Sequence, residues 1–151
     1  MPMEPITKDK LRNYIFLKME IENQLERLAR MKNDELIPAQ TESDGSKHTV
    51  GASDRMANAV IRRLSFQDSI HDEMEKKLRE IEYIQEAISA LEDPQEREVL
   101  RLRYIYGDGC RYMPWREISM KLYGDADDRS LHSTFRVHGR ALQDIYDMTS
   151  R

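Results

Sequence analysis

The chain has 151 residues, of which 34% are charged and 39% hydrophobic, with a formal net charge of −4 and a single cysteine, Cys110. This length fits one or two small domains, and the high charge favours elongated helices over a large compact core. One cysteine excludes an internal disulfide and a cysteine-rich zinc site, and the acidic balance weighs against a protein that coats DNA through charge alone. No apolar run approaches the roughly 18 residues of a membrane helix, and no secretory signal is indicated, so we expect a cytoplasmic protein that does not bind membranes.

The first predicted helix begins near Thr7 or Lys8, after a loose arm at residues 1–6. Its apolar side chains recur at spacings of three and four residues, which indicates one buried face. These side chains are Leu11, Tyr14, Ile21, Leu25 and Leu28. The helical pattern ends around residues 32–34.

Residues 34–53 show no helical period and contain Pro38, Gly45 and Gly51. A structureless stretch of this length is uncommon inside a compact domain, so we expect it to be disordered. The alternative is a partner-binding segment around residues 36–38.

The second predicted helix is much longer and runs from Ser53, its cap, to Leu91, because no glycine or proline interrupts it. Apolar residues follow a heptad-like period at Val60, Leu64, Met74, Leu78, Ile81, Ile88 and Leu91, and polar residues occupy the same seam at Gln67, His71 and Gln85. We expect a helical hairpin or coiled coil over residues 1–92, with a homodimer through this seam as the alternative. A two-helix core is thin, so self-association or docking on the C-terminal helices should complete it.

Residues 93–151 are predicted to form a separate helical domain. Asp93 as a cap, Pro94 at the first helical position and Glu96 at the third are typical of a helix N-terminus. Gly107 is predicted to end this helix.

Two more helices are predicted after it, so the expected fold class is all-α. Pro114 and Trp115 open the first of them, which runs to Leu122 and stops at Gly124. The last helix is predicted from Ser130 to Ile145. On one face of this helix, residues that can pack in a core recur at spacings of three and four: Thr134, Val137, Ala141, Leu142 and Ile145.

This C-terminal pattern resembles region 4 of bacterial sigma factors, in the stand-alone form found in small phage and prophage regulators such as the RinA-like and ArpU-like late-gene activators. The matching residues are Glu96, Arg97, Val99, Leu100, Leu102, Arg103, Tyr104, Gly107, Trp115, Glu117, Ile118, Leu122, Ser130, Val137, His138, Gly139, Arg140, Ala141 and Leu142. The chain departs from that family in two enlarged turns, at residues 108–114 and 123–129. The resemblance implies a C-terminal helix-turn-helix that binds double-stranded DNA beside host RNA polymerase.

The last helix is therefore the candidate recognition helix, since a helix in the major groove must present polar side chains to base edges and phosphates. Six residues are predicted to contact DNA: Arg129, Ser130, His132, Ser133, Arg136 and Arg140. Arg136 can bond a guanine in bidentate fashion or clamp a phosphate. Phe135 is expected on the same face, and Leu131 either packs inward or touches a thymine methyl. The alternative is a helix pair used only for packing, with a solvated polar face.

Other residues carry simpler interpretations. Trp115 and Tyr104 are expected to be core anchors. His132 and His138 lack the spacing that helical metal sites favour. Asp125, Asp127 and Asp128 resemble part of an acidic cation loop, but helix capping at Asp127 or Asp128 explains them better. Since no catalytic arrangement stands out either, we expect a non-enzyme without metal or cofactor.

The leading hypothesis is a phage or prophage transcription regulator that forms a homo-oligomer through its N-terminal helices and binds promoter DNA. A DNA-packaging protein like a small terminase subunit is the second hypothesis, because such proteins also combine a helix-turn-helix with a coiled coil. The third is a protein-interaction module that does not bind DNA, which the acidic composition favours.

Overall fold

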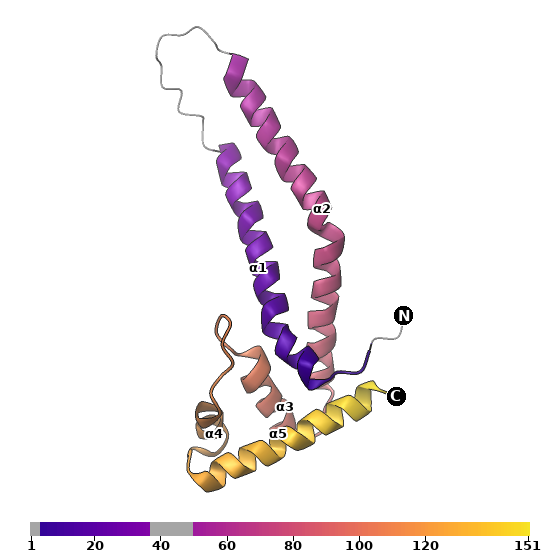
Figure 1. Ribbon diagram of the computed structural model, residues 1–151, viewed down its shortest axis with the longest axis vertical. Coiled ribbons are helices and arrows are strands. Elements are labelled where there is room, and N and C mark those ends of the chain that lie inside the picture. The colour runs from indigo at the N-terminus through magenta and orange to yellow at the C-terminus, as the bar shows by residue number, and fades with distance from the viewer. Residues whose placement is uncertain (1–3, 37–49) are drawn as a thin grey trace. The chain divides into compact units, whose positions relative to one another are not determined.

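The computed structural model describes residues 4–36 and 50–151, with side chains at 4–35 and 54–151, and every regular element in these ranges is helical (Figure 1). The helices are α1 (Lys8–Leu36), α2 (Val50–Ser89), α3 (Pro94–Leu100), the π-helical turn η1 (Arg101–Ile105), α4 (Trp115–Tyr123) and α5 (Asp128–Thr149). The expected all-α class is confirmed for these residues. None of the described helices combines the length and the apolar run that a membrane crossing needs.

Two compact units divide the chain, and both long helices contribute to each of them. The first unit consists of Met1–Met19 and Leu78–Arg151, and the second unit consists of Glu20–Lys77. The units therefore do not follow the predicted boundary between residues 92 and 93. The predicted disordered stretch falls largely on residues 37–49, which lie outside the described residues.

The first unit is built around one apolar core to which the N-terminal segment and every helix contribute. The fully buried members include Ile6 from the N-terminal segment, Leu11 from α1, Ile88 from α2, Val99 from α3, Ile118 from α4 and Ile145 from α5. The start of α1 and the end of α2 thus complete their core by packing on the C-terminal helices, one of the two arrangements expected from the sequence.

The N-terminal segment is part of this core, so the expectation of a loose arm at residues 1–6 is wrong for its described end. Ile6 is fully buried, and its backbone N–H donates to Thr149 Oγ1 at 2.9 Å. Tyr83 donates its hydroxyl to the carbonyl of Glu4 at 3.1 Å. Helix α1 then begins where expected, with Thr7 Oγ1 accepting from the N–H of Lys10 at 3.3 Å. The segment's own sequence carries no sign of these contacts, because their partners are 79 and 143 residues away.

Helix α3 begins as the sequence predicts, but the helical stretch that follows it ends differently. The Asp93 side chain accepts from the N–H of Gln95 at 2.9 Å, which confirms the cap. The stretch ends with η1 at Ile105, before Gly107, and Gly107 does not have a positive φ. A Cβ at Gly107 would lie 2.4 Å from the Arg111 carbonyl oxygen and 2.8 Å from Ile15 Cδ1. Glycine is needed here for close packing, not for a left-handed helix end.

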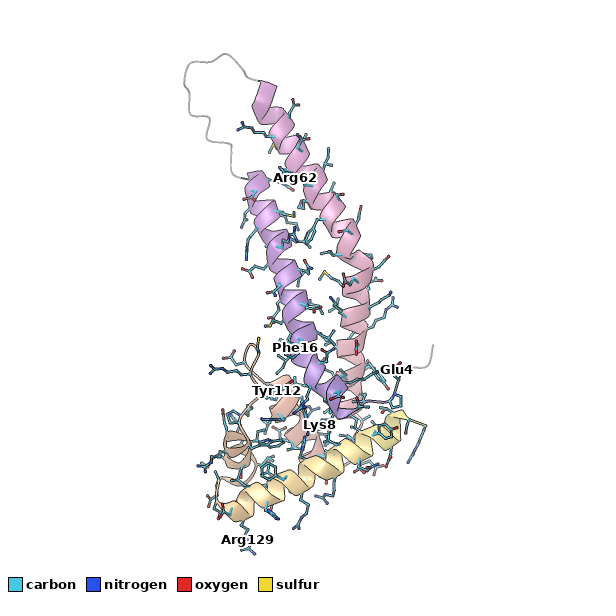
Figure 2. The ribbon with its side chains drawn as sticks, in the orientation of Figure 1. Glu4, Lys8, Phe16, Arg62, Tyr112 and Arg129 are labelled. Atoms are coloured by element: carbon cyan, nitrogen blue, oxygen red, sulfur yellow. The ribbon has the colours of Figure 1, made fainter. Side chains whose placement is uncertain are left out.

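The enlarged turn between η1 and α4 docks on α1. Its tip is closed by two backbone hydrogen bonds between Asp108 and Arg111, at 2.9 and 3.0 Å. Tyr112, labelled in Figure 2, donates its hydroxyl to the carbonyl of Arg12 in α1 at 2.7 Å. Arg103 donates to the carbonyl of Met113 at 2.7 Å. The turn is therefore attached to α1 through Tyr112 and to η1 through Met113.

In the second unit, α1 and α2 pair in antiparallel orientation. Glu35 near the end of α1 pairs with Arg63, and Glu20 pairs with Lys77 farther along α2. The guanidinium of Arg27 lies 4.3 Å from the centroid of the Phe66 ring. These contacts define which face of α2 meets α1 in this unit.

The predicted heptad seam of α2 is displaced in this unit. Leu64 is 47% exposed, and Gln67 and His71 are also exposed. Phe66 is half-buried and Ile70 is buried, although neither residue belongs to the predicted heptad row. The helix also begins at Val50, three residues before the predicted cap Ser53. The face of α2 that meets α1 therefore carries Phe66 and Ile70 together with the ion-pairing residues Arg63 and Lys77.

Candidate nucleic-acid interface

Helix α5 follows α4 after a four-residue turn, and its start is fixed by aspartates. Gly124 ends α4 with a φ of 72°, as predicted. Asp127 caps α5 by accepting from the N–H of Ser130 at 2.8 Å, a bond that holds the pKa of Asp127 below its usual range. Asp125 accepts from the N–H of Ala126 and of Asp127. The turn spans residues 124–127, shorter than expected, because both helices extend beyond their predicted ends.

Four predicted DNA-contact residues share one exposed stripe along α5. Arg129, His132, Arg136 and Arg140 follow one another at spacings of three or four residues, and all are exposed. Arg129 lies in the first turn of α5 (Figure 2). We call these four residues the basic stripe. Its three arginines lie within about 40° of one another around the helix axis, so they can face one surface together.

The opposite side of α5 packs in the core as predicted. Thr134, Val137, Ala141 and Ile145 are buried there, and Leu142 is half-buried. Thr134 donates its hydroxyl to the carbonyl of Ser130, which satisfies the one polar group in this row. The helix is therefore amphipathic, with the arginines held on its solvent side by the burial of the apolar row.

The two serines of the predicted site are less available than the arginines. Ser130 and Ser133 are both half-buried. Ser133 donates its hydroxyl to the carbonyl of Arg129 at 3.1 Å, so this group is used inside the helix. Phe135 is 47% exposed, as expected for the polar face, and it also packs edge-on against Trp115, with ring centroids 5.1 Å apart. Leu131 is half-buried.

Tyr104 and His138 join η1 to α5 through a buried hydrogen bond of 2.7 Å between the phenol oxygen and Nε2. Burial raises the pKa of Tyr104 to about 12. Burial, aided by the charges of Lys8 and Arg103, lowers the pKa of His138 to about 4. At neutral pH the phenol is therefore protonated and the imidazole neutral, so one proton lies between the two atoms.

Trp115 extends this contact to α4. The Trp115 ring lies edge-on to the His138 ring, with 4.7 Å between the two centroids. The guanidinium of Arg103 lies 4.3 Å from the centroid of the Trp115 ring. Tyr104 and Trp115 are packing residues, as predicted. The role of His138 was missed, although it lies on the buried side of the helical repeat between Thr134 and Ala141, a position that could have indicated it.

Replacing Tyr104 with phenylalanine is expected to destabilise the protein by about 1–2 kcal/mol, because His138 would keep a buried nitrogen without its partner. Urea denaturation followed by circular dichroism would measure the loss. The control is Tyr106→Phe, which removes the same hydroxyl from a residue that is 56% exposed. An equal effect in both variants would contradict a specific role for the buried bond.

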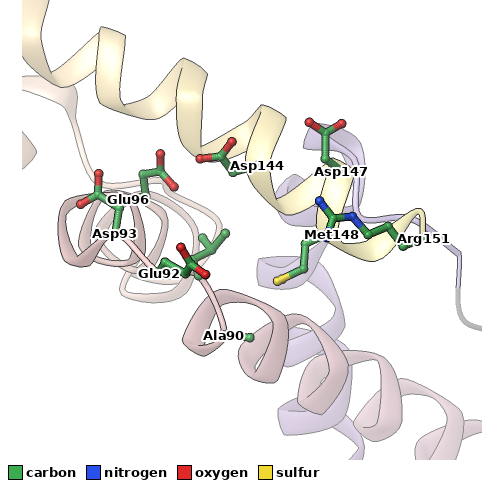
Figure 3. Close-up of a pocket in the computed structure, with 9 residues that line it drawn as sticks. Ala90, Glu92, Asp93, Glu96, Asp144, Asp147, Met148 and Arg151 are labelled. Atoms are coloured by element: carbon green, nitrogen blue, oxygen red, sulfur yellow. The ribbon is translucent and has the colours of Figure 1, made fainter.

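The basic character of α5 does not continue to its C-terminal end, where an acidic pocket of about 490 Å³ opens beside α3 (Figure 3). It is lined by Ala90, Leu91, Glu92, Asp93, Glu96, Asp144, Asp147, Met148 and Arg151. Glu96 is only 4% exposed. Its burial, its hydrogen bond to Asp144, and the charges of Asp144 and Asp93 raise its pKa to about 7, whereas Arg140 acts in the opposite direction. Arg140 therefore belongs both to the basic stripe and to the surroundings of this acid pair.

Replacing Glu96 with glutamine is expected to stabilise the protein at pH 8 by about 1–2 kcal/mol, because the neutral amide avoids ionising a buried carboxyl. The folded state raises the pKa of Glu96 from 4.5 to about 7. Its stabilising contribution is therefore complete below about pH 4.5 and is lost as the pH rises through about 7. The gain of the variant should be present at pH 8 and absent at pH 4 in urea denaturation.

Glu98→Gln is the matched control, since Glu98 is half-buried on the same helix. A gain at pH 8 in both variants, or a gain in Glu96→Gln that does not change with pH, would contradict the assignment of the effect to the buried carboxyl pair.

Comparison with known proteins does not identify a relative of this chain. No protein-family model, curated protein or solved structure matches the chain. The functional argument therefore depends on the residues of the site and on the sequence pattern.

Proposed function

We propose that this protein is a phage or prophage transcription regulator that binds double-stranded DNA through the basic stripe of α5. In this proposal α4, the turn and α5 act as a sigma region 4-like helix-turn-helix, carried by an N-terminal helical hairpin. The observation that supports it most is the alignment of Arg129, Arg136 and Arg140 on the exposed face of an otherwise packed helix.

The length of the stripe suits a major groove. Arg129 and Arg140 are eleven residues apart, which corresponds to roughly 16 Å along a helix axis. A stripe of this length covers about five base pairs of B-form DNA at 3.4 Å per base pair. The α5 helix can therefore place its arginines on bases and on the flanking phosphates of one half-site.

The strength of binding should be limited by charge. Three arginines that each neutralise one phosphate would give a salt slope of about −2.7, which is shallow for a specific DNA-binding protein. Asp125, Asp127 and Asp128 beside the first turn also oppose the approach of phosphates. We therefore propose that binding at promoters needs a second copy of the chain or host RNA polymerase on the same DNA, so that each contact strengthens the other.

The acidic start of α5 and the acidic pocket at its other end favour one alternative, a protein-interaction module whose C-terminal helices bind a protein partner and no DNA. Such a module would keep the packed face of α5 and would not use the stripe for phosphates. A test must therefore separate loss of DNA binding from loss of a protein complex.

The experiment is a binding selection from fragments of the source genome at physiological salt, with and without RNA polymerase. Enrichment of a promoter-proximal site by the protein alone supports an autonomous regulator, and enrichment only with polymerase supports an accessory factor. Recovery of a packaging site, together with a ring of many subunits in light scattering, would favour the small-terminase function. Recovery of nothing in either arm, with a stable polymerase complex, would favour the protein-interaction module.

A further inference from the structure

Three potential metal ligands gather on one turn of α2 in the second unit. The ligand atoms of His71, Asp72 and Glu75 all lie within 4.8 Å of one another. His71 Nε2 is 3.5 Å from Glu75 Oε1, one helical turn away. Residues four apart face the same side of a helix, so the imidazole and the Glu75 carboxylate converge without any change of the backbone.

None of the three side chains packs in a core. All are exposed, with 65% of the His71 side chain and 48% of the Glu75 side chain accessible. The face of α2 that meets α1 in this unit carries Phe66 and Ile70 instead. An ion could therefore reach the three ligands from solvent without disturbing the packing of the unit.

The charge around this turn also favours a cation. Between residues 68 and 80, the five carboxylates of Asp68, Asp72, Glu73, Glu75 and Glu80 outnumber the three cations Lys76, Lys77 and Arg79. The Lys77 ammonium pairs with Glu20 and with Glu73, at 3.2 Å for the latter, which offsets the charge of Glu73.

We propose that His71, Asp72 and Glu75 form a three-ligand site for a divalent transition-metal ion of the zinc class. The imidazole selects zinc, nickel or copper over magnesium and calcium, which prefer oxygen ligands alone. Ligands of one zinc ion at about 2.1 Å lie at most about 4.2 Å apart, so small side-chain rotations would close the site. Water would fill the remaining coordination positions.

A simpler interpretation of His71 and Glu75 is a surface ion pair at spacing i, i+4, formed when the imidazole is protonated. The two interpretations differ in the role of Asp72, because an ion pair between His71 and Glu75 does not require it. Metal binding does require it, since its carboxylate would be the third ligand.

Isothermal titration of the untagged full-length chain with zinc chloride would test the proposal, with magnesium chloride as a second probe. We expect one zinc ion per chain with a Kd below about 1 mM and no measurable binding of magnesium. His71→Gln, Asp72→Asn and Glu75→Gln should each weaken zinc binding at least about tenfold. The matched control is His132→Gln, which removes an exposed histidine of α5 and should leave zinc binding unchanged.

Three results would overturn the proposal: a wild-type Kd above about 1 mM, unchanged zinc binding in any of the three ligand variants, or an equal loss in His132→Gln. Circular dichroism of every variant would show that the helices persist, which the exposure of these side chains leads us to expect.

Discussion

Replacing Arg136 with alanine is expected to weaken binding to the selected DNA site by about 1–3 kcal/mol, or roughly 5- to 150-fold in Kd. Arg136 is exposed in the middle of the basic stripe, where a guanidinium can reach a guanine edge in bidentate fashion. Fluorescence anisotropy at one fixed salt concentration would measure the change on the selected fragment and on a scrambled fragment. A larger loss on the selected fragment indicates base reading, and an equal loss on both indicates a phosphate contact.

The matched control is Arg30→Ala, because Arg30 is an exposed arginine of α1 whose side chain is 71% accessible. It changes the net charge by the same amount away from α5. If Arg30→Ala weakened binding as much as Arg136→Ala, the effect would be one of total charge. Wild-type affinity in Arg136→Ala would remove this residue from the proposed interface.

Replacing Ile6 with alanine is expected to destabilise the protein by about 2–5 kcal/mol, because a fully buried side chain would leave a cavity in the core of the first unit. The backbone N–H of Ile6 also donates to Thr149, so the residue lies where the N-terminal segment meets the end of α5. Urea denaturation at pH 7 would measure the free energy of unfolding.

Ile61→Ala makes the same chemical change at a side chain that is 62% exposed in α2. Its effect should remain within about 0.5 kcal/mol, as is usual for surface positions. A small effect of Ile6→Ala, similar to that of Ile61→Ala, would contradict the packing of the N-terminal segment and would restore the expectation of a loose arm.

The signals that predicted correctly are local ones. Asp93, Gly124 and Asp127 each act within a few residues of their own position, through a side-chain cap or a left-handed backbone. The buried row of α5 was also predictable, since a period of 3.6 residues repeats over several turns. The exposed position of Arg129, Arg136 and Arg140 followed from the same repeat.

The errors concern partners that are distant in sequence. The sequence pattern predicts a helix end at Gly107, but the space around this residue is limited by Ile15 of α1 as well as by the nearby Arg111 carbonyl. The heptad pattern predicts Leu64 on the seam of α2, but Leu64 is 47% exposed, and Ile70 is buried on the face that meets α1 in the second unit. Arg140 was assigned to DNA alone, although it also acts on the buried carboxyl of Glu96 from α3.

The helical class of the described residues, the starts of α1, α3 and α4, and the arginine face of α5 follow from the sequence, because caps and periodicity act over one or two turns. The burial of Ile6, the hydrogen bond between Tyr104 and His138, and the contact between Glu96 and Asp144 become visible only in the folded chain. Each of these depends on burial between segments far apart in the chain. Only after those segments have packed does burial shift the pKa of a side chain, and only then does a buried polar atom need a hydrogen-bond partner.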